Sequence, residues 1–398
     1  MLKKVKLGEL ASVKGGKRLP KGINLITEPN SHPYIRVRDL NNRSTLELND
    51  DFEYVDDETQ KSIARYIVES GDIVLSIVGT IGLVAVVGES LHKANLTENC
   101  VKLTQLDGVD RDYLYYFLKS DLGQAEIAKG TVGAVQAKLP IKNIQAIDVV
   151  LPEIATQQKI SRILRSIDDK IENNQKINDN LEQQAQFYFQ ELFVDNANPE
   201  WTVGTISDLG TVVGGSTPSK AKPEYYTESG IAWITPKDLS INKSKFISHG
   251  ENDITELGLK NSSASIMPEG TVLFSSRAPI GYIAITAGEV TTNQGFKSVV
   301  PKPEIGTPFV YFFLKQNLPV IEGMASGSTF KEVSGNTMKN IPAIIPDTET
   351  LARFNEFCAP LFAQQRILEE ESQSLASLRD SLLPKLMSGE IDISDIQF

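Results

Sequence analysis

Two stretches of the chain alternate apolar and polar positions with a seven-residue period. Over residues 160–192, apolar positions recur in alternating steps of four and three, which predicts a coiled-coil helix. The same spacing runs over residues 354–386. Both seams turn polar near the centre, the first at Asn174 and Asn178. Two seams of matching length predict an antiparallel helix pair whose register is set by these polar residues.

The segments before the two helical stretches carry short β-branched and aromatic runs, separated by Gly, Pro, Asn and Asp clusters. Such runs predict strands. Residues 112–127 and 308–323 fit short helices better. Each segment is therefore predicted to be a mixed α/β domain, and the order is domain, helix, domain, helix. The predicted blocks are 1–151, 152–195, 196–346 and 347–398.

The two α/β blocks repeat each other at an offset close to 199 residues. "GDIVLSIVGTIGLVAVV" from Gly71 lies over "GTVLFSSRAPIGYIAIT" from Gly270, with Ser and an Ile-Gly pair at the same places. Further matches occur in the same order: "KLGELASVKGG" with "TISDLGTVVGG", "YIRVRDLN" with "WITPKDLS", "DYLYYFLKS" with "PFVYFFLKQ", and "GTVGAVQAKLPIKNI" with "GSTFKEVSGNTMKNI". These collinear matches indicate an internal duplication. The repeated Ile81-Gly82 and Ile280-Gly281 are predicted to serve core and turn.

Charge is unevenly spread over the 398 residues, whose net charge is −11. Each α/β block carries only −1, whereas the helical blocks carry −3 and −6. A net negative charge argues against a nucleic-acid partner, but a nearly neutral domain can still present a basic face. The only cysteines, Cys100 and Cys358, lie far apart in the sequence and indicate a cytoplasmic protein. No apolar run is long enough for a membrane helix.

The sequence carries no motif for catalysis. It has no P-loop, no His-Glu-x-x-His, no Gly-x-Ser-x-Gly and no clustered metal ligands. It also lacks the cofactor fingerprint and the Asn/Asp-Pro-Pro-aromatic motif of a methyltransferase. Ser275-Ser276-Arg277 could supply a nucleophile, yet the repeat partner is Ser76-Ile77-Val78. We therefore expect no enzyme activity and no bound metal.

Four segments resemble the specificity (S) subunit of type I restriction–modification systems: "GSTFKEVSGNTMKNIPAIIP", "LRDSLLPKLMSGEI", "LPEIATQQKISRILRSIDDKI" and "NQGFKSVVP". The order of domains and helices is similar as well, and the resemblance covers essentially the whole chain. It implies two similar target recognition domains, separated by two long antiparallel coiled-coil helices with pseudo-two-fold symmetry.

The resemblance also implies a function. Each domain would read one half of a bipartite site in double-stranded DNA. The helices would space the two halves and dock methyltransferase subunits, and restriction (endonuclease/translocase) subunits can join the assembly. The methyltransferase would bring S-adenosylmethionine, so this chain needs no cofactor of its own. Because the two copies have diverged, the half-sites can differ.

Contacts with DNA call for basic and amide side chains, and for small hydroxyls beside flexible backbone. Such residues flank the Gly pairs, follow the repeated strand and occupy two Gly-containing loops. Those predicted to contact DNA are Lys14, Lys17, Arg18, Lys21, Arg36, Arg38, Gln136, Lys138, Ser216, Thr217, Lys220, Lys222, Lys237, Arg277, Thr329 and Lys331. Asn99 and Asn293-Gln294 fit either turn capping or recognition.

Two other functions stay open at this point. A coiled-coil interaction scaffold that does not bind DNA agrees best with the negative net charge. An enzyme acting on nucleic acid without a partner is disfavoured by the missing motifs.

Overall fold

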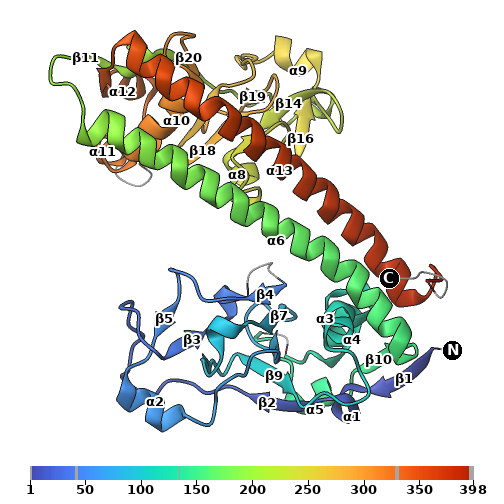
Figure 1. Cartoon of the computed structure of the whole chain (residues 1–398). Helices are drawn as coiled ribbons and strands as arrows, with labels where there is room; N and C mark the ends of the chain where they lie inside the picture. The colour runs from blue at the N-terminus through green and yellow to red at the C-terminus, as the bar shows by residue number, and fades with distance from the viewer. Residues whose placement is uncertain (1, 41–43, 134, 328–330, 394–398) are drawn as a thin grey trace. The chain divides into compact units, whose positions relative to one another are not determined.

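The computed structural model describes residues 2–40, 44–133, 135–327 and 331–393. The chain divides into two units: unit 1 is Met1–Asn173 with Ser372–Phe398, and unit 2 is Asn174–Glu371. Two long helices, α6 (Ile154–Gln190) and α13 (Thr348–Ser388), each contribute to both units. Figure 1 colours the chain from its N-terminus to its C-terminus and labels many of the helices and strands. Each unit thus consists of one α/β block and a part of each long helix.

The described residues of unit 1 form three small sheets. Its strands are β1 (Lys3–Lys6), β2 (Ser12–Gly15), β3 (Pro33–Ile35), β4 (Thr45–Leu46), β5 (Glu53–Tyr54), β6 (Ile73–Ser76), β7 (Val84–Val87), β8 (Asn95–Leu96), β9 (Cys100–Thr104) and β10 (Asp148–Leu151). The five-stranded sheet has the order β2-β9-β6-β7-β4, the three-stranded sheet β5-β3-β8, and β1 pairs with β10. Most neighbours are antiparallel, but β3–β8 and β4–β7 are parallel.

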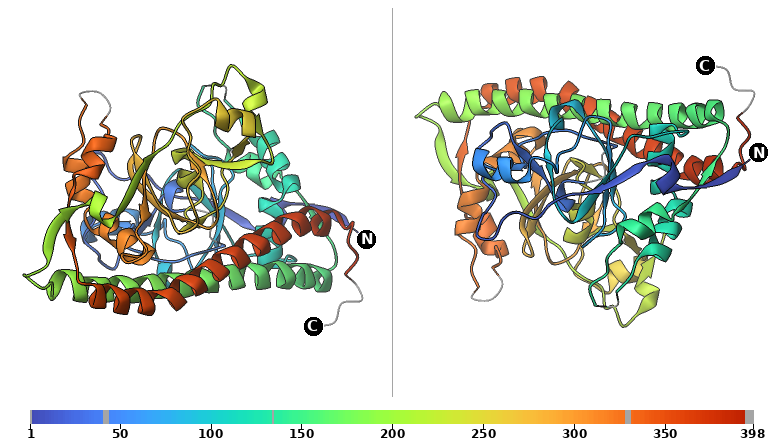
Figure 2. Two further views of the ribbon diagram at one scale, coloured as in Figure 1. Left: turned by 90° about the horizontal axis from the view of Figure 1, so that it is seen from above. Right: turned by 90° about the horizontal axis from the view of Figure 1, so that it is seen from below.

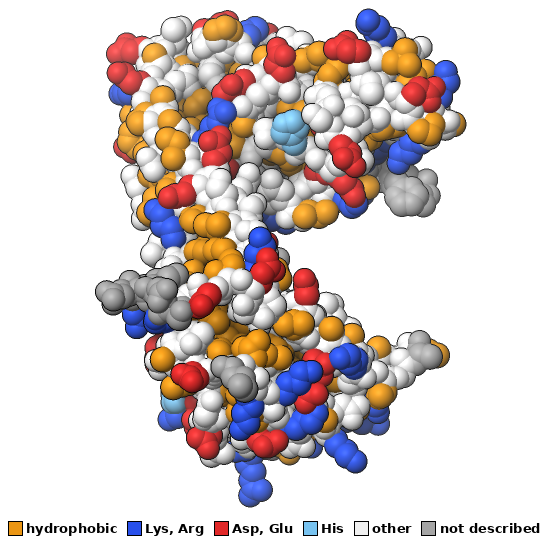
Figure 3. All heavy atoms as spheres, turned by 90° about the vertical axis from the view of Figure 1, so that its right-hand side faces the viewer, with side chains coloured by type: hydrophobic (Ala, Val, Ile, Leu, Met, Phe, Trp, Pro, Cys, Tyr) orange, Lys and Arg blue, Asp and Glu red, His pale blue; other side chains and the backbone are white. Residues whose placement is uncertain are grey.

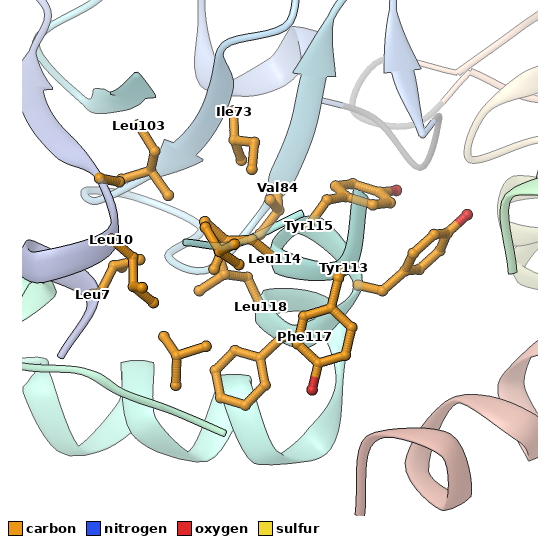
Figure 4. Packing of buried hydrophobic residues seen from close by; sticks show 14 of the residues in the cluster. Leu7, Leu10, Ile73, Val84, Leu103, Tyr113, Leu114, Tyr115, Phe117 and Leu118 are labelled. Carbon is orange, nitrogen blue, oxygen red and sulfur yellow. The ribbon is translucent and has the colours of Figure 1, made fainter. Parts of the chain in front are cut away.

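One core cluster of unit 1 lies between the five-stranded sheet and its helices. The helices are α1 (Leu7–Leu10), η1 (Val37–Asp39), α2 (Asp57–Ile63), η2 (Glu89–Leu91), α3 (Arg111–Lys119), α4 (Asp121–Gly130) and α5 (Ile141–Gln145). Asp110 caps α3 by accepting a hydrogen bond from the Tyr113 N–H. Tyr113 and Phe117 on this helix are fully buried with Leu7 (Figure 4). Each such side chain stabilises the fold by roughly 1.5–3 kcal/mol.

Unit 2 repeats this topology with one additional strand. Its strands are β11 (Thr202–Thr205), β12 (Gly210–Gly214), β13 (Tyr226–Thr227), β14 (Ile231–Ile234), β15 (Phe246–Ile247), β16 (Asn252–Ile254), β17 (Val272–Ser276), β18 (Ile280–Thr286), β19 (Thr291–Thr292), β20 (Lys297–Pro301) and β21 (Pro342–Ile345). The orders are β12-β20-β17-β18-β15, β13-β16-β14-β19 and β11-β21. Apart from β13, every strand has a counterpart at the same place in unit 1, so the predicted duplication is confirmed.

Most helices of unit 2 have counterparts in unit 1, apart from its first and third. They are η3 (Glu191–Asp195), α7 (Ile206–Leu209), η4 (Pro223–Tyr225), α8 (Pro236–Ile241), α9 (Glu256–Lys260), α10 (Thr307–Gln316), α11 (Leu318–Gly323) and α12 (Gly335–Lys339). The expected helices over 112–127 and 308–323 are confirmed, each split in two: α3 with α4, and α10 with α11. Phe309, Phe312 and Phe354 form an aromatic core with residues of α6.

The duplication has a shorter offset near the end of each block than the sequence match indicated. The Leu7 N–H donates to the Ile147 carbonyl, and the Ile206 N–H donates to the Ile341 carbonyl, at 2.9 and 3.0 Å. Ile341 therefore corresponds to Ile147, 194 residues away. The sequence match, which paired Ile341 with Ile144, was wrong by three residues. The hydrogen bonds define which residues of the two copies correspond. The two Lys-Asn-Ile triplets do not occupy equivalent positions.

The repeated Gly-Ser-Ile-Gly pattern builds the same turn in both units. The Ser76 hydroxyl donates to the Thr80 carbonyl and accepts from the Leu83 N–H, at 2.6 and 2.9 Å. Ser275 makes the equivalent bonds at 2.8 and 2.7 Å and is fully buried. Gly82 and Gly281 have φ of 92° and 96°, a region that favours glycine. The pattern therefore serves core and turn, as predicted, and Ser275 serves the turn.

The predicted seams of α6 and α13 form an antiparallel interface within each unit (Figures 1 and 2). In unit 1, Arg379 pairs with Asp168 at 2.8 Å. In unit 2, the Gln365 side chain donates to the Asn178 carbonyl at 3.1 Å. Asn174 is fully buried and donates to Glu371 at 2.7 Å. Buried amides with specific partners define one register, at some cost in stability.

No helix among the described residues combines the length and the apolar character needed to cross a membrane.

Candidate nucleic-acid interface

The candidate surface of each unit includes a turn that begins at a pair of adjacent glycines. A Cβ on Gly16 would lie 2.0 Å from the Thr97 carbonyl oxygen, and one on Gly215 would lie 1.9 Å from that of Asn293. Only glycine fits so close to a neighbouring backbone. The next residues, Lys17 and Ser216, donate from their N–H groups to strands β8 and β19, both at 2.8 Å. The polar turn after each Gly pair is thereby fixed to the sheet.

An aromatic residue secures this turn in both units. The Tyr34 hydroxyl donates to the Lys17 carbonyl at 2.7 Å, and the Trp233 indole donates to the Ser216 carbonyl at 3.0 Å. Tyr34 and Trp233 belong to the equivalent strands β3 and β14. Three segments therefore meet in each unit: the glycine turn, the end of β3 or β14, and the turn after β8 or β19.

The Asp of the repeated Asp-Leu pair shapes the segment after β3 and β14. The Asp39 carboxylate accepts from the Arg36 N–H, and Asp238 accepts from the Thr235 N–H, both at 2.7 Å. Burial raises the pKa of Asp39 to about 6, although Arg38 opposes the shift. These buried carboxylates are structural. The basic residue before each of them, Arg38 or Lys237, is exposed to solvent.

In unit 2 the three segments enclose a hollow of about 510 Å³. Four residues predicted to contact DNA line it, from the glycine turn, the segment after β14 and the turn after β17: Thr217, Lys220, Lys237 and Arg277. The structure also places Glu251, Asn252 and Thr235 there, which the sequence patterns did not indicate. Of the ambiguous pair, Asn293 caps the turn by accepting from the Gly295 N–H at 2.8 Å, whereas Gln294 is exposed at the hollow.

Acidic residues accompany most basic residues of this hollow. Lys237 pairs with Glu251 at 2.5 Å, and Arg277 with Glu332 at 3.6 Å. Ion pairs this exposed contribute little to stability, and each leaves other N–H donors of the cation available to DNA. Ser216 belongs to the adjoining turn. Lys222 lies outside the lining and donates to the Tyr225 hydroxyl at 3.0 Å.

Unit 1 arranges its predicted residues on the equivalent turns. Lys17 lies 5.5 Å from the ring centre of Tyr66, and Arg18 pairs with Glu98 at 2.6 Å. Arg36 and Arg38 both pair with Glu53, the latter at 3.3 Å. Lys14, on β2, and Lys21 are exposed. Figure 3 shows basic side chains interspersed with acidic ones on both units.

The remaining predicted residues lie on one short loop in each unit. In unit 1, Val132 and Lys138 exchange two backbone hydrogen bonds of 2.9 Å. Ser326 and Glu332 do the same in unit 2 at 3.0 and 2.9 Å. Gln136 and Lys138 are exposed, and so is Lys331. Thr329 lies outside the described residues.

The described residues contain no cluster of His, Cys, Asp and Glu that could hold a metal ion. What both surfaces offer is hydrogen-bond donors and positive charge on well-fixed turns. Such groups suit the recognition of phosphates and of base edges.

Both repeats also match a known protein family. The family described as "Type I restriction modification DNA specificity domain" matches residues 2–183 and 198–373. The chain belongs to this family. It contains two such specificity domains, one in each repeat, and each match runs through one α/β block into the helix that follows.

Relatives are named as specificity subunits of type I restriction enzymes. The MjaIX specificity subunit of a type I restriction enzyme from Methanocaldococcus jannaschii is 38% identical over 46% of this chain and 44% of its own length. The HindI specificity subunit from Haemophilus influenzae is 25% identical over 64% of this chain and 71% of its own length. The crystal structure of the S subunit from M. genitalium shares the fold, with a TM-score of 0.61 at 18% identity, over 97% of this chain and 96% of that one.

Proposed function

We propose that this chain is the DNA specificity subunit of a type I restriction–modification complex. Each unit reads one half of a bipartite site in double-stranded DNA. The observation that carries the proposal is the match of a DNA specificity domain to each repeat, combined with the equivalent donor-bearing turns of the two units. The bond network that holds these turns recurs in both copies, but the side chains presented to solvent differ. Two similar readers with different surfaces suit two different half-sites.

The predicted DNA-contacting residues fall into two groups under this proposal. Exposed lysines on turns, such as Lys14, Lys21 and Lys220, supply phosphate contacts, which are largely independent of sequence. The other predicted residues that line the hollow of unit 2, Thr217, Lys237 and Arg277, supply contacts to base edges. Phosphate contacts position the protein on the duplex, and base contacts provide the specificity.

The long helices dock methyltransferase subunits and set the spacing of the half-sites in this proposal. Their outer faces keep large apolar side chains in solvent: Phe187 is 71% exposed, Ile367 58% and Leu378 47%. Exposed aromatic and aliphatic residues favour a protein partner, and the acidic helical blocks disfavour phosphates. Restriction subunits join the same complex. The methyltransferase supplies S-adenosylmethionine, and the chain performs no chemistry alone. Its cytoplasmic location stays a prediction.

The test is methylome sequencing of hosts with the gene intact and deleted, with the methyltransferase gene present in both. Deletion should abolish one split methylated motif, because the methyltransferase loses its reader. An unchanged methylome with an active methyltransferase would refute the proposal and favour a scaffold that does not bind DNA.

A domain exchange makes the test specific to each unit. Replacing residues 1–151 with the corresponding block of another specificity subunit should alter only one half of the motif. A change in both halves would contradict separate reading by the two units.

A further inference from the structure

Equivalent hydrogen bonds show which residues of the two units occupy the same structural position near the hollow. The Ile77 N–H donates to the Asn99 carbonyl at 2.8 Å, and the Ser276 N–H donates to the Gly295 carbonyl at 2.7 Å. The residue after each of these donors is Val78 in unit 1 and Arg277 in unit 2. A valine and an arginine therefore occupy the same structural position.

The opposing loop differs in charge at the matching place. The Leu139 N–H donates to the Ile77 carbonyl at 2.9 Å, and the Val333 N–H donates to that of Ser276 at 3.0 Å. The preceding residues, Lys138 and Glu332, thus correspond. Unit 1 combines an apolar side chain with a lysine, whereas unit 2 combines an arginine with a carboxylate.

Glu332 fixes the position of Arg277. Its backbone is held to Ser326 by two hydrogen bonds, and its carboxylate lies 3.6 Å from Arg277 and 3.5 Å from Lys297. Arg277 keeps 37% of its side chain exposed and lines the hollow beside Gln294 and Lys237. A guanidinium has five N–H donors in a planar fork, so one carboxylate contact leaves others available.

The carboxylate decides which DNA group Arg277 can bind. A phosphate beside Glu332 would place two negative charges close together, which is unfavourable. A base edge carries no net charge and avoids that cost. Guanine presents two acceptors, N7 and O6, in the major groove, and arginine binds both at once. The side chain of Val78 has no donor and can contact DNA only through its methyl groups.

We propose that Arg277 reads a guanine in the half-site of unit 2 and that Glu332 is its positioning residue. The inference rests on the proposed function, because it needs specific DNA binding. At the equivalent position unit 1 makes no such contact, and its Lys138 binds phosphate. The two half-sites therefore differ at this position, because the two units carry different side chains there.

The experiment uses the chain in complex with its methyltransferase, on the motif found by methylome sequencing. The residue 1–151 exchange identifies which half belongs to unit 2. Affinities are then measured for cognate and unrelated duplexes with wild type, Arg277→Ala and Lys220→Ala. Arg277→Ala should weaken cognate binding roughly five- to 150-fold, as expected for one bidentate base contact, and change unrelated DNA little. Lys220→Ala should weaken both duplexes alike.

Substituted DNA identifies the contacted base. Replacing each guanine of that half-site in turn with 7-deazaguanine removes the N7 acceptor. One position should weaken wild-type binding and have no effect on Arg277→Ala, which is the signature of a direct contact. Glu332→Gln should raise affinity for unrelated DNA and reduce the ratio of cognate to unrelated binding, with thermal unfolding unchanged.

The outcomes separate the two hypotheses. If the wild-type complex shows no preference for the motif, the proposed function fails. If the preference exists but Arg277→Ala weakens both duplexes equally, or the half-site contains only A·T pairs, the guanine inference alone is overturned. A Glu332→Gln variant with unchanged affinities would reject the positioning role.

Discussion

The Nζ atom of Lys245 lies 2.8 Å from the Glu182 carboxylate, within the interior of unit 2. The ammonium also lies 3.2 Å from the ring centre of Phe362. Burial lowers the pKa of Lys245 to about 8, although Glu182 opposes the shift. Lys315 reaches the second carboxylate oxygen of Glu182 at 2.6 Å. One carboxylate of α6 therefore holds two lysines of the α/β block against the helices.

Unit 1 makes the corresponding attachment with a different charge arrangement. Asp168 of α6 accepts from the Tyr116 hydroxyl at 2.6 Å and pairs with Arg379 of α13 at 2.8 Å. Here the ion pair joins the two helices, and the α/β block contributes a neutral hydroxyl. The two blocks share a fold but attach to their helices through different chemistry.

Glu182→Ala should destabilise unit 2 strongly. The substitution leaves two lysines without their carboxylate in a buried site, and breaking a buried pair in this way costs about 3–5 kcal/mol. Chemical denaturation of the purified chain would show the loss of unfolding free energy. Glu269→Ala is the matched control, because Glu269 forms an exposed pair with Arg366 and should cost less than about 1 kcal/mol. Equal losses for both variants would contradict the buried role.

The same carboxylate should make stability fall in acid. Burial opposes ionisation of Glu182, but Lys245 and Lys315 outweigh it and lower the pKa to about 2 from 4.5. A group with a lowered folded-state pKa stabilises fully above the unfolded value and loses that contribution as pH falls through the folded value. About 3 kcal/mol should disappear between pH 4.5 and 2. Denaturation of wild type and Glu182→Gln across this range would test it, since the variant should lack this part of the slope.

Gly215→Ala should disrupt the polar turn of unit 2. The new Cβ would lie 1.9 Å from a backbone oxygen, which side-chain movement cannot relieve. We expect a loss of at least about 2 kcal/mol, with weaker DNA binding by the complex. Gly288→Ala provides the comparison, because nothing lies within 4 Å of its Cβ, and it should change stability by less than about 0.5 kcal/mol. A well-tolerated Gly215→Ala would show that the close approach does not constrain the turn.

Lys17→Ala should weaken binding of the complex to cognate and unrelated DNA by similar factors. Lys17 is exposed on the glycine turn of unit 1, and a phosphate contact releases counterions without regard to sequence. The plot of log affinity against log salt concentration should become shallower, its negative slope losing about 1 in magnitude. Lys61→Ala, on α2 of the same unit, should leave the slope unchanged. An unaltered slope for Lys17→Ala would place Lys17 away from the phosphates.

Several features could be predicted from the sequence because they depend on local or periodic signals. The coiled-coil seams, the aromatic helices and the Gly-Ser-Ile-Gly turn all follow from residue spacing. The duplication was visible because turns and core positions tolerate few replacements. The register of the final loops does not follow from the sequence, because three matching letters carry less information than the equivalent hydrogen bonds that Ile147 and Ile341 accept in their own units.

Other features depend on residues that meet only after folding. The sequence by itself determined the repeat and the element types, and it predicted a set of donors for DNA. Only the tertiary structure decided that Thr217, Lys220, Lys237 and Arg277 line one hollow, and that Glu251 and Glu332 accompany two of them. The physical reason is the sequence separation over which each signal acts. Periodicity and turn chemistry act over a few residues. Ion pairs join side chains that are far apart in the sequence and are brought together by sheet pairing.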